Sequence, residues 1–372
     1  MTDRQPTYPG RVKLIPVEGQ KDVYDMERAD EPVVVGTPLN KGTLLADLTC
    51  AVLGLPTTAV PNDAFLRLAL PEGKFVVRVS VVSPGGLPLS GITIQGLETI
   101  NGGTVVTGDD GTAIGFTTAA SPVTITAVNP FLDISGNVSA SVTLATDVIN
   151  ECTLTFVRGS ATSKTFTAST TVRFSPDVDI FNCSAIGGGN NGAAGTSRQD
   201  TSINQGAVAW GGKGGNAGAV ANAANLANPG TDISVVVGGV GGTSKIGNYI
   251  TATGGGGAVG GNGAYARSGY WDEDCTHTNA TNGGNTTGFL YPATSVGGAA
   301  GGGGAQAVGG EEGHESYEYG QAGSSGSPGY PAYGSGGSGG SGYYRYDPAQ
   351  SNNTSGGPGM QGLCGMTWSY KN

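Results

Sequence analysis

The chain has 372 residues, enough for about two to four domains, and only 12% of them are charged, with a net charge of −10. A nucleic-acid partner is excluded because the sequence has no basic stripe to neutralise phosphates. No apolar stretch reaches the roughly 18 residues of a membrane span, and the N-terminus lacks an apolar leader core. We therefore expect synthesis in a cytoplasm without membrane insertion.

The first 72 residues are polar and punctuated by prolines. A helical pattern runs from 41 to 53, with Asn40 as its candidate N-cap and Gly54 after its end. Asn62 and Asp63 are placed to cap a shorter second helix. Residues 1–72 contain too few apolar residues to build their own core, so we expect this segment to dock on a partner protein.

From Lys74 onward the apolar residues recur with a period of two, which indicates strands. The alternating residues are Phe75, Val77, Val79 and Val81, and later Val138, Ala140, Val142 and Leu144. Turn signals separate these runs at 84–86, 101–103, 109–111 and 129–130. Regular turns between short strands predict a small antiparallel β-sandwich over residues 73–158.

The segment SPGGLPLSGITIQG, followed by TGDDGTAIGF, resembles the start of immunoglobulin-like or prealbumin-like spacer domains. The resemblance implies that residues 73–158 separate functional parts of the chain. A further pair of strands is predicted at Thr165–Phe174 and Val178–Ile186, and it leads directly into a glycine-rich region.

Most of the 69 glycines lie in residues 159–372, and many recur at every third position. The clearest series are Gly189, Gly192, Gly195; Gly212, Gly215, Gly218; Gly254, Gly257, Gly260, Gly263; Gly320, Gly323, Gly326, Gly329; and Gly356, Gly359, Gly362, Gly365. A period of three predicts an extended left-handed helix of the polyglycine-II type, whose glycine edge lets neighbouring helices approach closely. We expect a module of such packed helices and short strands, in a chain that is mainly β.

The glycine-rich region has two alternative interpretations. Collagen needs an unbroken Gly-X-Y register and much more proline, whereas these triplets break after three or four units. A disordered linker is the second alternative, and GSGGSGGSG at 334–342 has that composition. Interleaved aromatic residues are unusual in disordered linkers and favour a folded module.

Two segments resemble proteins of tailed bacteriophages. TFTASTTVRFSPDVDIFNCSAIGGGNNG and TDISVVVGGVGGTSKIGNYITATGGGGAVGG resemble the glycine-rich domain of phage tail fibres and tail-tip proteins, including the polyglycine sandwich of T-even phage adhesins. YPGRVKLIPVEGQKDVYDMERADEPVVVGTPLNKGTLLADLTCAVLGL resembles the opening segment of structural proteins from phages of Gram-positive hosts. The resemblance implies a virion protein anchored by residues 1–72, with loops at one end of the bundle touching a bacterial receptor.

Little in the sequence indicates catalysis, and we expect no enzyme, catalytic residue, cofactor or metal. The five cysteines are dispersed without a CxxC pair and are predicted to be reduced and packed. Glu311, Glu312, Glu315 and Glu318 surround His314, either as a metal site or carboxylate pair, or as a solvent-exposed acidic loop. A polysaccharide depolymerase would need a long β-solenoid and paired acids, and neither is evident.

The YWDED run at 270–274 joins an aromatic face to carboxylates and suits a sugar or calcium, unless Trp271 simply covers the end of the bundle. Aromatic loops flanked by glycine suit recognition because tyrosine supplies contact area at low entropy cost. The candidate receptor-binding residues are Tyr265, Tyr270, Trp271, Asp272, Asp274, Phe289, Tyr291, Tyr317, Tyr319, Tyr343, Tyr344 and Tyr346.

The sequence thus predicts a phage tail-fibre or tail-tip adhesin, exposed on the virion, that binds a host surface glycan or protein. Its expected partners are other virion proteins, bound through residues 1–72, and further copies of itself. A homotrimer is usual for fibres, and a single copy on a trimeric stalk is the alternative. A non-binding head fibre, capsid decoration or collar protein remains the alternative function.

Overall fold

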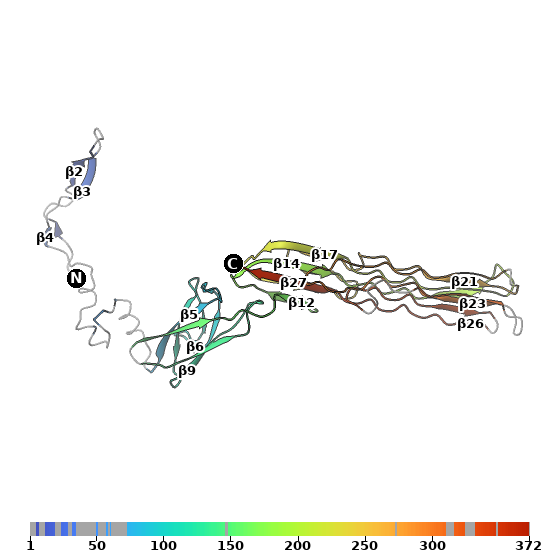
Figure 1. The fold of residues 1–372 in the computed structure, drawn as a ribbon, viewed down its shortest axis with the longest axis horizontal. Helices are drawn as coiled ribbons and strands as arrows, with labels where there is room; N and C mark the ends of the chain where they lie inside the picture. The colour runs from blue at the N-terminus through green and yellow to red at the C-terminus, as the bar shows by residue number, and fades with distance from the viewer. Residues whose placement is uncertain are drawn as a thin grey trace.

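The computed structural model describes residues 5–6, 12–18, 24–28, 32–34, 50, 57–58, 60, 73–145, 148–271, 274–309, 316–323, 332–346 and 349–371. Across these residues the chain is mainly β, with several separate sheets and almost no helix (Figure 1). The predicted β-rich class is therefore confirmed.

The N-terminal segment contains short paired strands that the sequence pattern did not predict. Strands β1 (Gln5–Pro6) and β4 (Pro32–Val34) pair antiparallel, and β2 (Val12–Pro16) forms a hairpin with β3 (Tyr24–Arg28). Leu14 and Tyr24 are about half exposed, so this hairpin buries little of its apolar surface. The two predicted helices lie outside the described residues, apart from Cys50, which is helical and buried.

Residues 73–158 hold one seven-stranded sheet in the order β10-β9-β6-β8-β5-β11, with β7 paired to β6. Its strands are β5 (Phe75–Val82), β6 (Thr93–Glu98), β7 (Thr104–Val106), β8 (Thr112–Thr117), β9 (Val123–Ala127), β10 (Val138–Val142) and β11 (Ile149–Thr155). Strands β6 and β8 meet at a single pair, Glu98 and Phe116, and the core of this part of the chain includes Val77, Val79 and Ile125.

The prediction of an entirely antiparallel fold is wrong at one edge of this sheet. Strand β11 pairs parallel to β5 from Ile149 opposite Val76 to Thr155 opposite Val82. A parallel pair needs a long crossover, and here the intervening strands β6 to β10 provide it. The predicted turns at 84–86, 101–103 and 109–111 are confirmed, and 129–130 lies in the connection between β9 and β10.

Two four-stranded sheets form the near end of the glycine-rich module. One has the order β12-β27-β14-β17, and the other the order β13-β18-β19-β20. The strands are β12 (Ser163–Phe166), β13 (Thr170–Val172), β14 (Val178–Ile186), β17 (Val220–Ala227), β18 (Ile233–Val236), β19 (Ser244–Ile246), β20 (Ile250–Ala252) and β27 (Leu363–Tyr370). Their shared core includes Phe174, Phe181 and Trp368.

The predicted strand at Val178–Ile186 is confirmed as β14, but the prediction of one strand at Thr165–Phe174 is wrong. That stretch divides into β12, which pairs with β27, and β13, which pairs with β18. Neither half pairs with β14, because β27 from the far end of the sequence lies between β12 and β14.

From this base, extended glycine runs lead away to the far end of the module and back (Figure 1). We number the described runs in chain order: run 1 (187–195), run 2 (211–219), run 3 (256–264), run 4 (279–285), run 5 (296–304), run 6 (332–341) and run 7 (352–362). These runs belong to no strand, so their backbone groups must find partners on neighbouring runs.

Those partners recur at every third residue. The amides of Gly189, Gly192 and Gly195 in run 1 donate to the carbonyl oxygens of Met360, Gly357 and Thr354 in run 7. Similarly, Gly212, Gly215 and Gly218 in run 2 donate to Gly340, Gly337 and Gly334 along run 6. The pairs step by three in both partners, so each run repeats its bonding every three residues.

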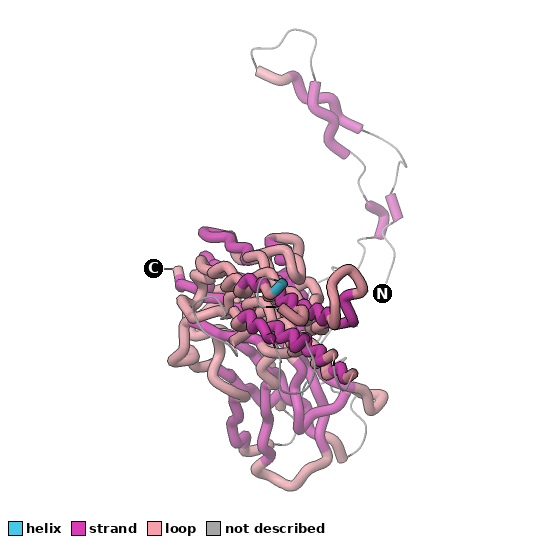
Figure 2. Tube along the Cα trace, turned by 90° about the vertical axis from the view of Figure 1, so that its right-hand side faces the viewer, coloured by secondary structure: helices cyan, strands magenta, loops and turns pink. Residues whose placement is uncertain are grey.

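The hydrogen bonds place the runs in two layers. Runs 1 to 4 bond in sequence to form one layer, and runs 7, 6 and 5, followed by residues 321–323, form the other. Run 5 bonds to run 2, run 3, run 4, run 6 and Gly323, and every one of its residues is buried. Figure 2 views the module nearly end-on. A run enclosed in this way has no solvent-facing position, which explains why run 5 is almost entirely glycine and alanine.

Glycine is required at these inward positions for lack of space. A Cβ atom on Gly192 would lie less than 3.0 Å from backbone atoms of Gly337 and Ser338, and one on Gly303 would meet backbone atoms of Gly339 and Gly340. By contrast, Lys213 is exposed between the buried residues Gly212 and Gly214. Long and charged side chains such as Lys213 therefore occur where a run faces solvent, whereas the buried positions carry mostly glycine and small residues such as Ala217 and Ala300.

Candidate functional site

At the far end of the module, each described outward run continues into a strand of one of two small sheets. The first sheet has the order β15-β16-β21-β22 and extends the layer of runs 1 to 4; the second has the order β24-β23-β25-β26 and extends the other layer. The strands are β15 (Thr196–Asp200), β16 (Gly206–Trp210), β21 (Tyr265–Ser268), β22 (Thr276–Thr278), β23 (Ala305–Gly309), β24 (Ser316–Gly320), β25 (Gly342–Arg345) and β26 (Gln350–Ser351).

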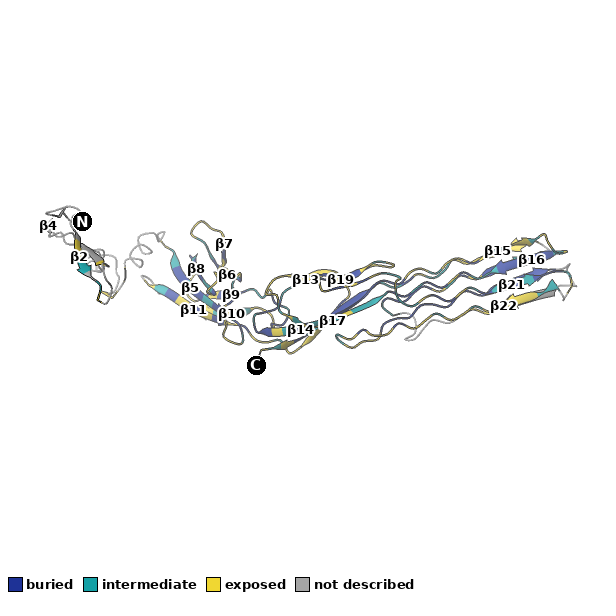
Figure 3. Cartoon of the chain, turned by 90° about the horizontal axis from the view of Figure 1, so that it is seen from above, coloured by how far each residue is buried: buried dark blue, intermediate teal, exposed yellow. Residues whose placement is uncertain are grey.

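A thin core of alanines joins the two sheets. Its fully buried members, at most 1% exposed, are Ala207, Ala209, Ala264, Ala266, Ala305 and Ala307. In Figure 3 the inner strands β16 and β21 are coloured mainly as buried or intermediate, whereas the edge strands β15 and β22 are mainly exposed. Short methyl side chains let the layers approach closely and give the end loops a rigid support.

We call the described residues of the end loops, 200–206, 268–271 and 274–276, the tip surface. An ion pair joins the first of these loops to strand β21, which leads into the second, with Nε of Arg267 2.7 Å from Oδ2 of Asp200. The hydroxyl of Ser202 also donates to Oδ1 of Asp200 at 2.6 Å and accepts from Arg267 at 2.8 Å. Burial raises the pKa of Asp200, but the bonds from Ser202 and Arg267 outweigh it and lower the pKa to about 2. The tip surface is thus held by a charged network.

The sequence-predicted residues Tyr270 and Trp271 lie together on the tip surface. The two rings meet edge to face, with centroids 4.8 Å apart and planes at 86°. The amide of Tyr270 donates to the carbonyl of Asn204 at 3.1 Å, and the amide of Asp274 donates to that of Trp271 at 3.0 Å. Trp271 remains 58% exposed, so the tip surface presents an indole ring to solvent.

Tyr265 belongs instead to the flank behind the tip surface. Its ring lies 6.0 Å from that of Trp210, and the guanidinium of Arg198 lies 5.4 Å from the Trp210 ring centroid. Arg198, Asp200, Ser202, Trp210 and Arg267 were not predicted from the sequence. The only signal for them is that a polar hairpin at 196–210 connects two glycine runs and so must lie at an end of the bundle.

Among the predicted tyrosines of the second sheet whose side chains the structure describes, Tyr319 is exposed and the others are only partly exposed. Tyr344 packs against the alanine core, and Tyr343 and Tyr346 are half-buried. Tyr319 on β24 is 54% exposed. Tyr317 lies on the same strand, where its backbone pairs with Val308. The second sheet therefore offers Tyr319 as its most exposed described aromatic residue.

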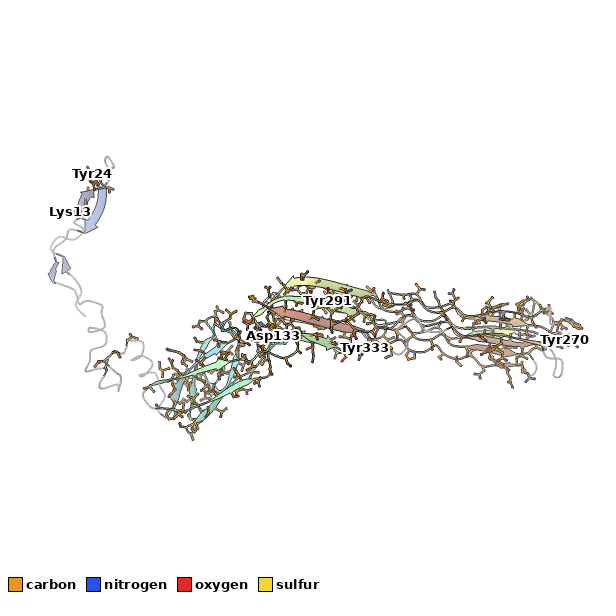
Figure 4. The ribbon with its side chains drawn as sticks, viewed as in Figure 1. Lys13, Tyr24, Asp133, Tyr270, Tyr291 and Tyr333 are labelled. Carbon is orange, nitrogen blue, oxygen red and sulfur yellow. The ribbon has the colours of Figure 1, made fainter. Side chains whose placement is uncertain are left out.

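Phe289 and Tyr291 do not belong to this end of the module. Figure 4 shows Tyr270 at the far end and Tyr291 close to the base strands. Phe289 is only 4% exposed and packs with Ile186, Val296 and Leu363, while the amide of Tyr291 donates to the Ser184 hydroxyl of β14 at 2.8 Å. The prediction that these two residues share one contact surface with Tyr270 is wrong, because run 4 returns the chain to the base before residue 289.

The described residues contain no group of three or more His, Cys, Asp or Glu side chains that would hold a metal. Asp272, Glu311, Glu312, His314 and Glu315 lie outside the described residues, and the Glu318 side chain does too. The cysteines form no disulfide among themselves; four are buried, whereas Cys275 is partly exposed, contrary to the expectation that all are packed.

The spacer sheet and the glycine module meet at two buried carboxylates. Asp133 of the spacer accepts hydrogen bonds from the amide and hydroxyl of Ser175, at 2.8 and 2.6 Å. Reciprocally, Asp177 of the module accepts from the Ser83 hydroxyl at 2.7 Å and the Gly85 amide at 2.8 Å. Each side supplies a carboxylate to the other, so the tip surface is carried on a connected support.

In the described part of the chain, no helix is long and apolar enough to cross a membrane. No protein-family model matches the chain, and no curated protein matches its sequence.

Proposed function

We propose that this protein is a structural component of a phage virion, of the tail-fibre or tail-tip class, that binds the surface of a host bacterium. The observation that carries the proposal is the placement of the tip surface. The exposed Trp271, packed against the half-buried Tyr270, lies at the end of a long module, remote from the base strands that connect to the spacer (Figures 1 and 4). An adhesin needs its contact surface held away from the particle in this way.

We also propose that the glycine runs are polyglycine-II helices. Hydrogen bonds at every third residue, buried glycines at the inward positions and side chains at the solvent-facing position all support this geometry. Such helices make no internal hydrogen bonds, so their stability depends on dense bonding between runs. In this proposal the dense bonding stiffens the arm while leaving the end loops free to vary in sequence.

The remaining parts take supporting roles in the proposal. Residues 1–72 attach the chain to other virion proteins, and the seven-stranded sheet is an immunoglobulin-like spacer. Three copies of the chain form the fibre, so that weak single contacts gain strength from multiple attachment. The surface ligand is a glycan or a protein of the host envelope, and the protein is not an enzyme.

A head fibre or capsid decoration protein is the alternative, because it shares the anchor and the spacer. Immunogold electron microscopy of the parent virion, with antibodies against the full chain, separates the two functions. The adhesin proposal predicts gold at the end of the tail and slower adsorption of antibody-treated phage. Gold on the capsid, with unchanged adsorption, would favour the decoration protein.

A further inference from the structure

We propose that Trp271 is the platform on which a sugar ring of a host cell-surface polysaccharide stacks, with Asn204 and Asp274 beside it as hydrogen-bonding groups. This inference rests on the proposed function and names the class of ligand for the tip surface. It excludes a protein receptor that would take Trp271 into an apolar pocket.

Trp271 is unusually exposed for a tryptophan. The other tryptophans of the chain are less exposed: Trp368 is 6% exposed in the base core, and Trp210 is half-buried between Arg198 and Tyr265. An indole ring that stays 58% exposed forgoes the free energy that its burial would supply. A ligand that covers the ring would recover that free energy.

The Trp271 ring is held in place before any ligand arrives. The Tyr270 ring supports it edge to face, and the Trp271 carbonyl accepts from the amide of Asp274 at 3.0 Å and the thiol of Cys275 at 3.7 Å. The Tyr270 amide is fixed to the neighbouring loop at Asn204. A preorganised aromatic side chain loses little conformational entropy on binding.

The surface around the Trp271 ring is largely polar. Ser202, Asn204 and the three residues of β22, which read Thr-His-Thr, are exposed. The apolar neighbour Ile203 lies against Gly206 and Gly269 instead of extending the exposed patch. A protein pocket favours a contiguous apolar patch, whereas a sugar presents one apolar ring face bordered by hydroxyls. One aromatic ring surrounded by polar groups matches the sugar.

Asn204 and Asp274 are the groups best placed to bond those hydroxyls. Asn204 is exposed, and its backbone bond to Tyr270 fixes it next to the aromatic pair. Asp274 is partly exposed at the end of the Trp271 turn. A carboxylate accepts hydroxyl protons, and an amide side chain both donates and accepts. The pair therefore supplies both kinds of partner that a vicinal diol requires.

The test measures binding of the purified full chain to cell walls of the host, before and after periodate oxidation, which cleaves the vicinal diols of sugars. We expect oxidation to abolish binding and Trp271→Ala to weaken it at least tenfold, with Trp271→Phe intermediate. Leu290→Ala is the control, because Leu290 is a similarly exposed large apolar residue that lies beside the base strand β14, away from the tip surface. Circular dichroism verifies that each variant is folded.

The outcomes separate this inference from the proposed function. Binding that survives periodate but is lost after protease treatment, or that is unaffected by Trp271→Ala, would overturn the sugar platform and leave the adhesin intact. If the wild-type chain does not bind even untreated host cell walls, the adhesin function itself is refuted.

Discussion

At the scale of single residues, the every-third-glycine spacing predicted close approach of neighbouring segments, and the contacts at Gly192 and Gly303 bear this out. The same spacing did not predict which aromatic residues share a surface. Tyr270 and Phe289 look equivalent in the sequence, yet one lies at the tip surface and the other is buried at the base. Their separation depends on how many residues each run takes to cross the module, and composition does not encode this number.

Substitutions in run 2 test the packing argument directly. In Gly215→Ala, the new Cβ would lie within 3.0 Å of backbone atoms of Asn190 and Gly337. Overpacking of this kind costs about 1–3 kcal/mol, which outweighs the ~0.4–1 kcal/mol that alanine contributes by stiffening the unfolded chain. We expect a lower melting temperature by calorimetry. Lys213 in the same run is exposed, so Lys213→Ala should change the free energy of unfolding by no more than about 0.5 kcal/mol. Equal destabilisation by Gly215→Ala and Lys213→Ala would contradict the two-layer packing.

Thiol reactivity tests the burial of the base core. Burial raises the pKa of Cys183 and of Cys364 to about 12, from a usual value of 9.0. Since thiolates react and thiols do not, alkylation at pH 8 followed by mass spectrometry should modify Cys275 and spare these two. Burial favours the protonated thiols of Cys183 and Cys364 in the folded state. Their contribution to the free energy of unfolding is therefore complete below pH 9 and is lost as the pH rises toward 12. Rapid alkylation of Cys364 in the native protein would show that the base core is open.

The tip surface should loosen in acid. The pKa of Asp200 is lowered to about 2 from 3.8, so its ion pair contributes fully above pH 3.8 and is lost as the pH falls toward 2. The protection factor of the Tyr270 amide against hydrogen exchange should therefore fall over that interval. In Asp200→Asn, this pH dependence should disappear; its persistence would mean that another group controls the loops.

At the scale of elements, local pattern predicted β14 and most turns, but pairing partners came from distant parts of the chain. Strand β11 returns parallel to β5, and β27 enters between β12 and β14. Periodicity shows which face of a strand is buried and is silent about its neighbour. The short N-terminal hairpin was missed because a five-residue strand such as β2, with Leu14 half exposed, carries little pattern.

The junction between the spacer and the module is also an element-scale feature, and it is testable. Asp133→Ala would leave the buried amide and hydroxyl of Ser175 without their partner, a cost of about 1–3 kcal/mol. We expect a lower unfolding temperature and, in small-angle scattering, a broader distribution of spacer-to-module distances. Asp179→Ala is the control, because Asp179 is exposed on the adjoining strand β14. Identical scattering from both variants would show that the carboxylates do not hold the junction.

At the scale of the whole molecule, the glycine runs separate the base strands from the tip surface, and all described outward runs end in the two far sheets. This arrangement follows from the sequence pattern only in outline. Repeated glycine triplets predicted a laterally bonded bundle, but the two-layer order and the enclosed position of run 5 depend on tertiary hydrogen bonds.

In the proposed function, the tip surface makes the contact with the host. The most direct test is competition, in which the purified full chain is added to host cells before the parent phage and adsorption is counted. We predict that the wild-type chain and the Leu290→Ala variant block adsorption in a dose-dependent way, because Leu290 is exposed near the base and away from the tip surface. The double variant Tyr270→Ala/Trp271→Ala should need at least tenfold more protein. Equal blocking by all three chains, or no blocking by the wild type, would contradict the account.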